Sequence, residues 1–233
     1  MNDFSGYITR HLTIIVGAYG SGKSEISVNL ALSLAAERQT YLADLDIINP
    51  FYRSADTAAM LKTANVTLIS SVYAGTNVDV PAVPAEVNRV FVDKETYAVL
   101  DIGGEDLGAR IVGSLRPQIE QCSYDLLMAV NPFRPYTDTA GKIAEAAHSL
   151  SAACKLPLGG FIYNPNLLEA SDSMLLDEGW PIMMDACLQT GLGIKFATVM
   201  SEYALEHYRF LPADLPILKM KRTIHYPSDF QEE

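Results

Sequence analysis

Gly17-Ala18-Tyr19-Gly20-Ser21-Gly22-Lys23-Ser24 is the stretch that decides the fold, because it matches the pattern G-x-x-x-x-G-K-[ST] in full. The apolar run Leu12-Thr13-Ile14-Ile15-Val16 precedes it and indicates a buried strand. After it, Ile26, Leu30 and Leu34 recur at helical spacing. A strand, a glycine-rich turn and a helix in this order bring backbone N–H groups and a positive helix end to a phosphate. The stretch therefore predicts a site for a nucleoside triphosphate with Mg²⁺.

The residues of this loop have distinct predicted roles. Lys23 is expected to reach the β- and γ-phosphates, and the Ser24 hydroxyl is expected to coordinate Mg²⁺. The remaining positions are expected to offer backbone N–H groups to phosphate oxygens: Gly17, Gly20, Ser21 and Gly22. The alternative interpretation is a glycine-rich strand-to-helix turn that binds no ligand.

The amino-acid composition limits which partners the protein can bind and indicates the cellular compartment in which it works. The 233 residues carry a net charge of −11 at pH 7 and are 49% hydrophobic. This charge argues against a nucleic acid or an anionic membrane as partner. The three cysteines are widely spaced, no signal peptide is visible, and no apolar run is long enough to span a bilayer. We therefore expect a cytoplasmic protein with reduced thiols.

Strand-like and helix-like segments alternate along the chain. The predicted strands are Thr13–Val16, Thr40–Asp44, Val66–Ser70, Ala98–Ile102, Leu126–Val130, Gly159–Tyr163, Ile194–Val199 and Pro216–Lys219. The predicted helices are Ser24–Glu37, Pro84–Val92, Leu107–Gln121, Thr137–Ser151, Ser173–Thr190 and Glu202–Phe210. The pattern predicts an α/β fold with a doubly wound, mostly parallel sheet of about seven or eight strands and helices on both faces. We expect one domain over residues 1–233, with its core at about 11–220 and a polar tail at 221–233.

Acidic residues stand at the ends of two predicted strands. Asp44 and Asp46 end the strand near residue 40, and Asp101 ends the strand near residue 98. Asp101 fits a Walker B pattern, and Gly104 follows it at the D-x-x-G spacing of a switch that senses the γ-phosphate. Mg²⁺ binding and the orientation of a water need such carboxylates. Helix-capping or solvated turn residues are the alternative interpretation.

Together these residues resemble the MinD/ParA/CobQ group of P-loop proteins, within the SIMIBI class. The resemblance is strongest over residues 12–54 and 96–136. It implies that Asp46 orients the attacking water, that Asp44 and Asp101 serve the Mg²⁺, and that Gly104 lies in switch II. It also implies that Asn131, in Asn131-Pro132-Phe133-Arg134-Pro135, lies in a nucleotide loop and that Asn164 reads the base.

Two positions depart from this group. Ala18 stands where MinD and ParA proteins carry a signature lysine that reaches a dimer partner's phosphates. Asn164-Pro165-Asn166-Leu167 stands where a GTPase would show N-K-x-D, so the aspartate that pairs with guanine is missing. The resemblance therefore implies a subfamily without the signature lysine, and the base site favours ATP over GTP.

Several functions remain open at this point. The first is a Mg²⁺-dependent ATP-binding protein that hydrolyses ATP slowly and switches an unidentified protein partner, with a homodimer as one oligomeric state that the resemblance suggests. The second is a small-molecule kinase or ATP-dependent ligase of the dethiobiotin or cobyrinate synthetase type. A maturation GTPase and a module with a structural nucleotide are further alternatives. Arg53 and Arg134 follow predicted nucleotide loops and could bind phosphate or form surface contacts.

Overall fold

The computed structural model describes residues 4–46, 55–70, 84–103, 107–168, 171, 174–200 and 210–223. Its strands are β1 (Leu12–Val16), β2 (Thr40–Asp44), β3 (Val66–Ser70), β4 (Tyr97–Asp101), β5 (Tyr124–Val130), β6 (Gly160–Tyr163), β7 (Ile194–Met200) and β8 (Ile217–Met220). Its α-helices are α1 (Lys23–Leu34), α2 (Ala55–Thr63), α3 (Arg89–Val92), α4 (Ala109–Ile119), α5 (Ala140–Cys154) and α6 (Leu175–Thr190). Two 3₁₀ turns, η1 (Ser5–Tyr7) and η3 (Ala85–Asn88), complete the described elements.

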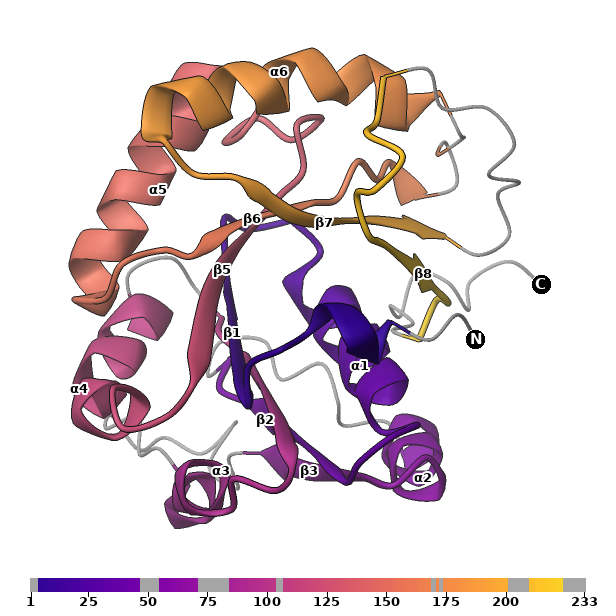
Figure 1. The fold of residues 1–233 in the computed structure, drawn as a ribbon, viewed down its shortest axis with the longest axis vertical. Helices are drawn as coiled ribbons and strands as arrows, with labels where there is room; N and C mark the ends of the chain where they lie inside the picture. Colours follow the sequence, from indigo (N-terminus) through magenta and orange to yellow (C-terminus); the bar gives the residue numbers. More distant parts are fainter. Residues whose placement is uncertain are drawn as a thin grey trace.

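The strands form one sheet in the order β3-β2-β4-β1-β5-β6-β7-β8. Every strand pair that the structure describes is parallel. All five residues of β1, of β2 and of β4 are buried, as expected for central strands that are covered on both faces. The predicted doubly wound α/β sheet is confirmed, and β1, which leads into the glycine-rich loop, lies between β4 and β5 at its centre (Figure 1).

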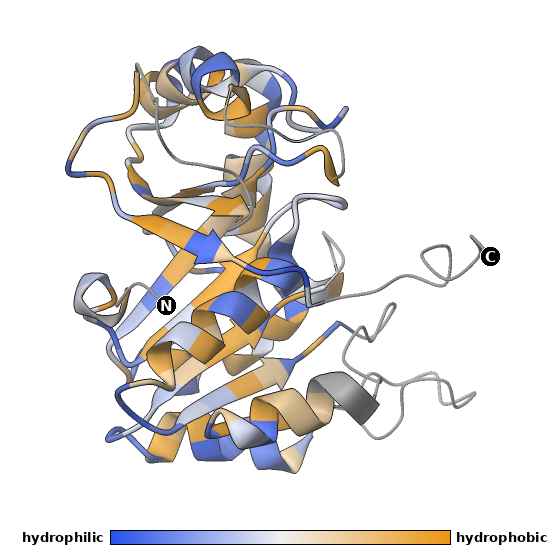
Figure 2. Ribbon diagram, turned by 90° about the vertical axis from the view of Figure 1, so that its right-hand side faces the viewer, coloured by the Kyte–Doolittle hydropathy of each residue, from blue (hydrophilic) through white to orange (hydrophobic). Residues whose placement is uncertain are grey.

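Side chains of the sheet alternate between two apolar cores, one on each face. Leu12, Ile14 and Val16 of β1 join the core that α4, α5 and α6 cover. Ile15 joins the core that α1 and α2 cover. Figure 1 shows these two groups of helices on opposite sides of the sheet, and Figure 2 shows the largely hydrophobic strands between them. The period-two alternation therefore fixes which strand-end side chains face α1.

Predicted and observed elements agree closely for the strands and less well for the helices. Each predicted strand is present, with bounds that differ by at most two residues. Helix α5 begins three residues later than predicted because Thr139 caps it, its hydroxyl accepting the Lys142 backbone N–H at 3.3 Å. The predicted helix over residues 84–92 is η3 followed by the short α3. The predicted helix over residues 202–210 lies outside the described residues except at Phe210.

Helix α2 was not predicted from the sequence. Its segment carries few large apolar residues, and Leu61 is the one that is fully buried in the core beneath α1. A nine-residue helix of this composition depends on tertiary packing rather than on its own periodicity. In the described part of the chain, no helix combines the length and apolar character needed to cross a membrane.

Candidate functional site

The glycine-rich loop lies between β1 and α1, at the carboxyl end of the central strand. Gly17 and Gly22 have φ of 151° and 84°, values that side chains with a Cβ rarely adopt. A Cβ on Gly17 would lie 2.5 Å from the Ala129 carbonyl oxygen, and a Cβ on Gly22 would collide with the Asn164 amide nitrogen. Both glycines are therefore required for the loop to pass between β5 and the end of β6.

The loop folds around the amine of Lys23. Its Nζ donates hydrogen bonds to the carbonyl oxygens of Gly17 at 2.8 Å and of Ala18 at 3.0 Å. The Ser21 backbone N–H closes the turn on the Ala18 carbonyl at 3.2 Å. Because Lys23 is also the first residue of α1, the positive dipole end of the helix and the ammonium lie at the same place. The predicted phosphate-binding residues Gly17, Gly20, Ser21, Gly22 and Lys23 are thus brought together in one turn.

Asp44 and Asp101 end adjacent strands and are paired in register, so their side chains leave the sheet on the same side. They are 3% and 1% exposed, and that side is the one that α1 covers. Ser27 of α1 donates its hydroxyl to Asp101 Oδ1 at 3.2 Å. Ser24 lies three residues before Ser27 and therefore on the same face of α1. The structure thus places Ser24, Asp44 and Asp101 at one corner of the loop.

This corner suits Mg²⁺. In the regions that the structure describes, no three His, Cys, Asp or Glu side chains form a ready-made metal cage. Mg²⁺ in nucleotide sites takes one or two carboxylates together with phosphate oxygens and water, so it needs no such cage. One hydroxyl and two carboxylates beside the predicted phosphate-binding loop match that requirement.

Asp46 lies where the ends of β2 and β4 meet. Its backbone N–H donates to Asp44 Oδ1 at 3.0 Å, and its carboxyl group packs directly over Gly103, where any Cβ would overlap it. The Leu45 N–H extends the pairing by donating to the Asp101 carbonyl at 2.9 Å. The predicted water-orienting carboxylate therefore touches the segment that leads into the second predicted switch. Gly104 itself lies outside the described residues.

The Asn164 side chain holds the loop from the end of β6. Its Nδ2 donates to the Ser21 carbonyl at 2.7 Å, and its Oδ1 accepts the Thr198 hydroxyl at 2.6 Å. Asn164 is 2% exposed, so both bonds are shielded from water. The sequence predicted that Asn164 reads the base, and the structure gives this amide a loop-positioning contact that the sequence did not predict.

Asn131 organises the loop that follows β5. Its Nδ2 donates to the Asn166 carbonyl at 2.6 Å, and its Oδ1 accepts the Phe133 N–H at 3.1 Å. The Thr137 hydroxyl donates to the Asn131 carbonyl at 2.7 Å. Asn131 therefore ties the loops after β5 and β6 to each other, and its assignment to a nucleotide loop stays a prediction.

Ser27 and Thr198 are the site residues that sequence reasoning missed. Ser27 could have been found by its spacing, because it lies one helical turn after Ser24. Thr198 carries no local signal, since it lies in β7 and meets Asn164 only through strand pairing in the folded sheet.

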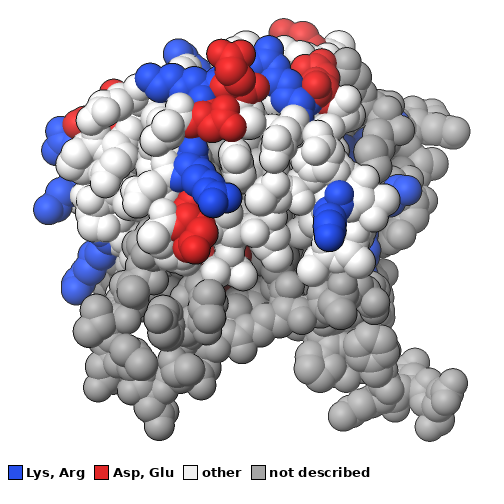
Figure 3. Space-filling view, turned by 90° about the horizontal axis from the view of Figure 1, so that it is seen from below, with Lys and Arg blue, Asp and Glu red and all other residues white. Residues whose placement is uncertain are grey.

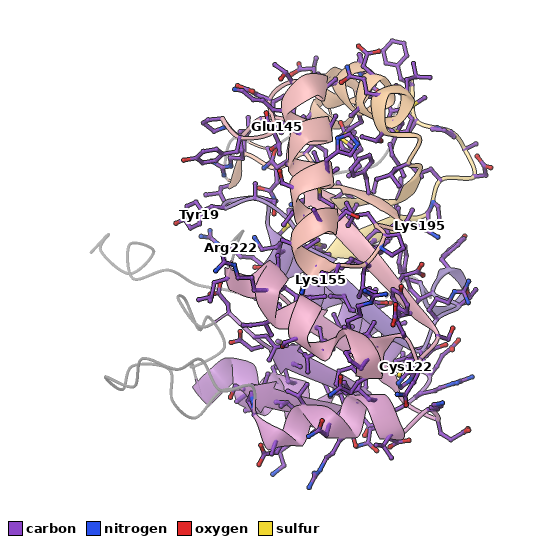
Figure 4. The ribbon with its side chains drawn as sticks, turned by 90° about the vertical axis from the view of Figure 1, so that its left-hand side faces the viewer. Tyr19, Cys122, Glu145, Lys155, Lys195 and Arg222 are labelled. Carbon is purple, nitrogen blue, oxygen red and sulfur yellow. The ribbon has the colours of Figure 1, made fainter. Side chains whose placement is uncertain are left out.

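A groove of about 410 Å³ opens beside the loop. Its lining includes Ala18 of the loop, Tyr136 and the α5 residues Lys142, Glu145 and Leu150. In Figure 4, Glu145 and Lys155 mark the upper and lower parts of α5, and Tyr19 lies at a level between them. The groove therefore runs along α5 and borders the predicted phosphate loop at Ala18.

Charge on the described surface is mixed. On the face seen in Figure 3, acidic and basic side chains are interspersed. The described ion pairs follow the same pattern: Arg116–Glu120 at 2.8 Å, Lys142–Asp138 at 2.7 Å and Lys195–Asp125 at 3.6 Å.

No protein-family model matches the sequence, and no curated protein matches it at the sequence level. Solved structures share its fold. FtsY from Mycoplasma mycoides aligns over 81% of this chain and 59% of its own, with a TM-score of 0.52 and 14% identity. The 54 kDa signal recognition particle protein from Aeropyrum pernix, in complex with GDP, aligns over 82% of this chain and 41% of its own, with a TM-score of 0.52 and 17% identity. FlhF complexed with GTP and Mg²⁺ aligns over 88% and 71%, with a TM-score of 0.53 and 13% identity. The chain thus spans about half the length of the first two proteins, and its fold is the α/β P-loop fold that all three share.

Proposed function

We propose that this chain binds Mg²⁺ and ATP through the loop at residues 17–24, hydrolyses ATP slowly, and uses the nucleotide state to switch a protein partner. The observation that carries the proposal is the juxtaposition of Lys23, in its closed loop, with Asp44 and Asp101, paired in register beside α1. Cytoplasmic location, a single domain over residues 1–233 and membership of the MinD/ParA/CobQ group within the SIMIBI class are parts of the same proposal.

In this proposal each residue of the site has one task. The loop N–H groups and Lys23 bind the β- and γ-phosphates. Ser24, Asp44 and Asp101 hold the Mg²⁺, which neutralises charge on the phosphates when it is bound. Asp46 accepts a hydrogen bond from the attacking water and orients it. Replacing any of these side chains would weaken phosphate binding or hydrolysis.

The contact between Asp46 and Gly103 supports the switch. It joins the segment after β2 to the segment after β4, so a displacement of one carries to the other. Gly104, as the next residue, is the proposed sensor of the γ-phosphate. The two segments would form the surface that an unidentified protein, or a second copy of this chain, recognises.

The choice of ATP over GTP rests on the base site. Leu167 occupies the position of the guanine-pairing aspartate in N-K-x-D. GTP is the competing nucleotide, because two of the proteins that share the fold were solved with GDP or with GTP and Mg²⁺. GTP preference would move the proposal toward a maturation GTPase.

A second candidate function is a small-molecule kinase or ATP-dependent ligase of the dethiobiotin or cobyrinate synthetase type. The groove beside Ala18 favours it, because a second substrate bound there would lie next to the phosphate loop. In this alternative, ATP use would be slow with protein alone and rapid once a metabolite extract is added.

Titration of ATP and GTP, each with Mg²⁺, into the purified chain tests the proposal. Wild type should bind ATP more tightly than GTP, and Lys23→Ala should bind neither. Lys195→Ala is the matched control, because it removes a half-exposed lysine that pairs with Asp125 near the start of β5, at the end of the sheet opposite the loop. ATP should also alter protease sensitivity around residues 46–56 and 101–110. Failure of wild type to bind either nucleotide would refute the proposal.

A further inference from the structure

Arg134 lies in a turn whose backbone is fixed. The loop after β5 is held by the Arg134 N–H donating to the Asn131 carbonyl at 3.1 Å and by the Thr137 N–H donating to the Arg134 carbonyl at 2.9 Å. The Thr137 hydroxyl adds a further bond to this loop by donating to the Asn131 carbonyl at 2.7 Å. These hydrogen bonds therefore fix the position of the Arg134 backbone, from which the side chain extends.

From this turn the Arg134 side chain crosses to the phosphate loop. Its Cδ, Nε and Cγ atoms lie 3.7, 3.8 and 3.9 Å from where a Cβ on Gly20 would be. Gly20 has φ of 77° and stands in the middle of the loop, between the two glycines that fix its ends. The apolar stem thus passes over Gly20, so close that any Cβ at this position would be in van der Waals contact with it.

The charge on Arg134 is uncompensated within the described part of the chain. Its Nε is buried there without a hydrogen-bond partner, and none of the three described ion pairs includes Arg134. Lys142, farther along the same segment, instead donates to Asp138 and to the Pro135 carbonyl. In a chain with a net charge of −11, acidic partners are abundant, so a half-buried guanidinium without one is unusual.

We infer that Arg134 binds the terminal phosphate of the nucleotide held by its own chain. This inference rests on the proposed function and adds a residue to it. A guanidinium offers a planar set of N–H donors that matches phosphate oxygens, and phosphate would supply the partner that Nε lacks. The loop provides one cation of its own, Lys23, because Ala18 brings none. Arg134 adds the second cation from the neighbouring loop and on the same chain.

Nucleotide titration of two variants tests this inference. Arg134→Met keeps the stem against Gly20 and removes the charge, while Arg134→Lys keeps the charge and removes the planar fork. The probes are the Mg²⁺ complexes of the diphosphate and of a non-hydrolysable triphosphate, with whichever base wild type prefers. Arg134→Met should lower triphosphate affinity about ten-fold or more and diphosphate affinity less than about three-fold. Arg134→Lys should recover part of the loss.

Controls separate this inference from the proposed function. Arg116→Ala removes an exposed arginine paired with Glu120 and should leave both affinities unchanged. If wild type binds no nucleotide, the proposed function and this inference both fail. If wild type binds and Arg134→Met changes both affinities equally or not at all, only this inference fails. Recovery of hydrolysis on mixing Lys23→Ala with Arg134→Met would show that the arginine serves another chain's nucleotide, which would also overturn it.

Discussion

Replacing Asn164 with alanine tests whether this side chain holds the phosphate loop in place. The amide of Asn164 joins the Ser21 carbonyl to the Thr198 hydroxyl, at 2.7 and 2.6 Å. Alanine removes both bonds and leaves both partners in the interior, because Ser21 and Thr198 are each 1% exposed. The variant should therefore lose stability and also loosen the loop.

The size of the loss follows from these two contacts. A buried hydrogen bond contributes about 1 kcal/mol net, and each polar group left without a partner costs about 1–3 kcal/mol. Asn164→Ala should accordingly lower the free energy of unfolding by about 2–4 kcal/mol. Thr198→Val breaks only one of the two bonds and should cost about 1–2 kcal/mol. The double variant should lose less than the sum, because the Asn164–Thr198 bond is counted in both single variants.

Urea unfolding of the three variants measures these losses, and nucleotide titration measures the functional effect. If Asn164 holds the loop in place, Asn164→Ala should lower the affinities for ATP and for GTP by the same factor. A base-reading role predicts a change in the ratio of the two affinities. A stability loss below about 0.5 kcal/mol, within the range of surface substitutions, would refute the argument from the two hydrogen bonds.

Three further predictions concern the loop, the sheet and the thiols. Gly22→Ala should destabilise the protein by about 2 kcal/mol and abolish nucleotide binding, because alanine resists a φ of 84° and its Cβ would displace the Asn164 amide; unfolding and titration curves check both. Thr13→Val should stabilise the protein by about 1 kcal/mol in urea unfolding, because among described atoms the buried Thr13 hydroxyl has no hydrogen-bond partner. Burial raises the pKa of the Cys154 thiol from 9.0 to about 12, so its contribution to stability is complete below pH 9 and is lost as the pH rises toward 12. The thiol should make the free energy of unfolding fall by up to about 1.4 kcal/mol per pH unit between pH 9 and pH 12, and Cys154→Ala should remove this part of the fall. The same dependence of unfolding free energy on pH in wild type and Cys154→Ala would contradict the raised pKa.

The strands and the phosphate loop could be predicted because their signals are local. Each buried parallel strand is a short apolar run, and the loop is a contiguous motif between a strand and a helix. Asp44 and Asp101 could be placed at one edge because all carboxyl ends of parallel strands meet there, and their pairing in register agrees with that reasoning. Local sequence thus predicted the strands, their parallel arrangement and the edge of the sheet at which the acidic residues gather.

The contacts that hold the site could not be predicted because they join distant parts of the chain. Asn164 and Ser21 are 143 residues apart, and the Arg134 stem meets Gly20 only because β5 lies beside β1. Helix α2 was missed for a related reason, since Leu61 gains its stabilising contact from the core beneath α1 rather than from its neighbours in sequence. In each case the missing information was the order of strands in the sheet.

The charges at the loop make Mg²⁺ necessary rather than accessory in the proposed function. Asp44, Asp46 and Asp101 are all buried beside a loop that must accept a highly charged anion. Lys23 and Arg134 together carry less formal charge than those three carboxylates, so a divalent cation would favour the entry of phosphates. Asp44 Oδ1 already accepts a hydrogen bond from the Asp46 N–H at 3.0 Å. A divalent cation that bound this oxygen would compete with that hydrogen bond. In the proposed function, Mg²⁺ binding would therefore act on Asp46 through this hydrogen bond, and this is the step that would link binding to the proposed switch.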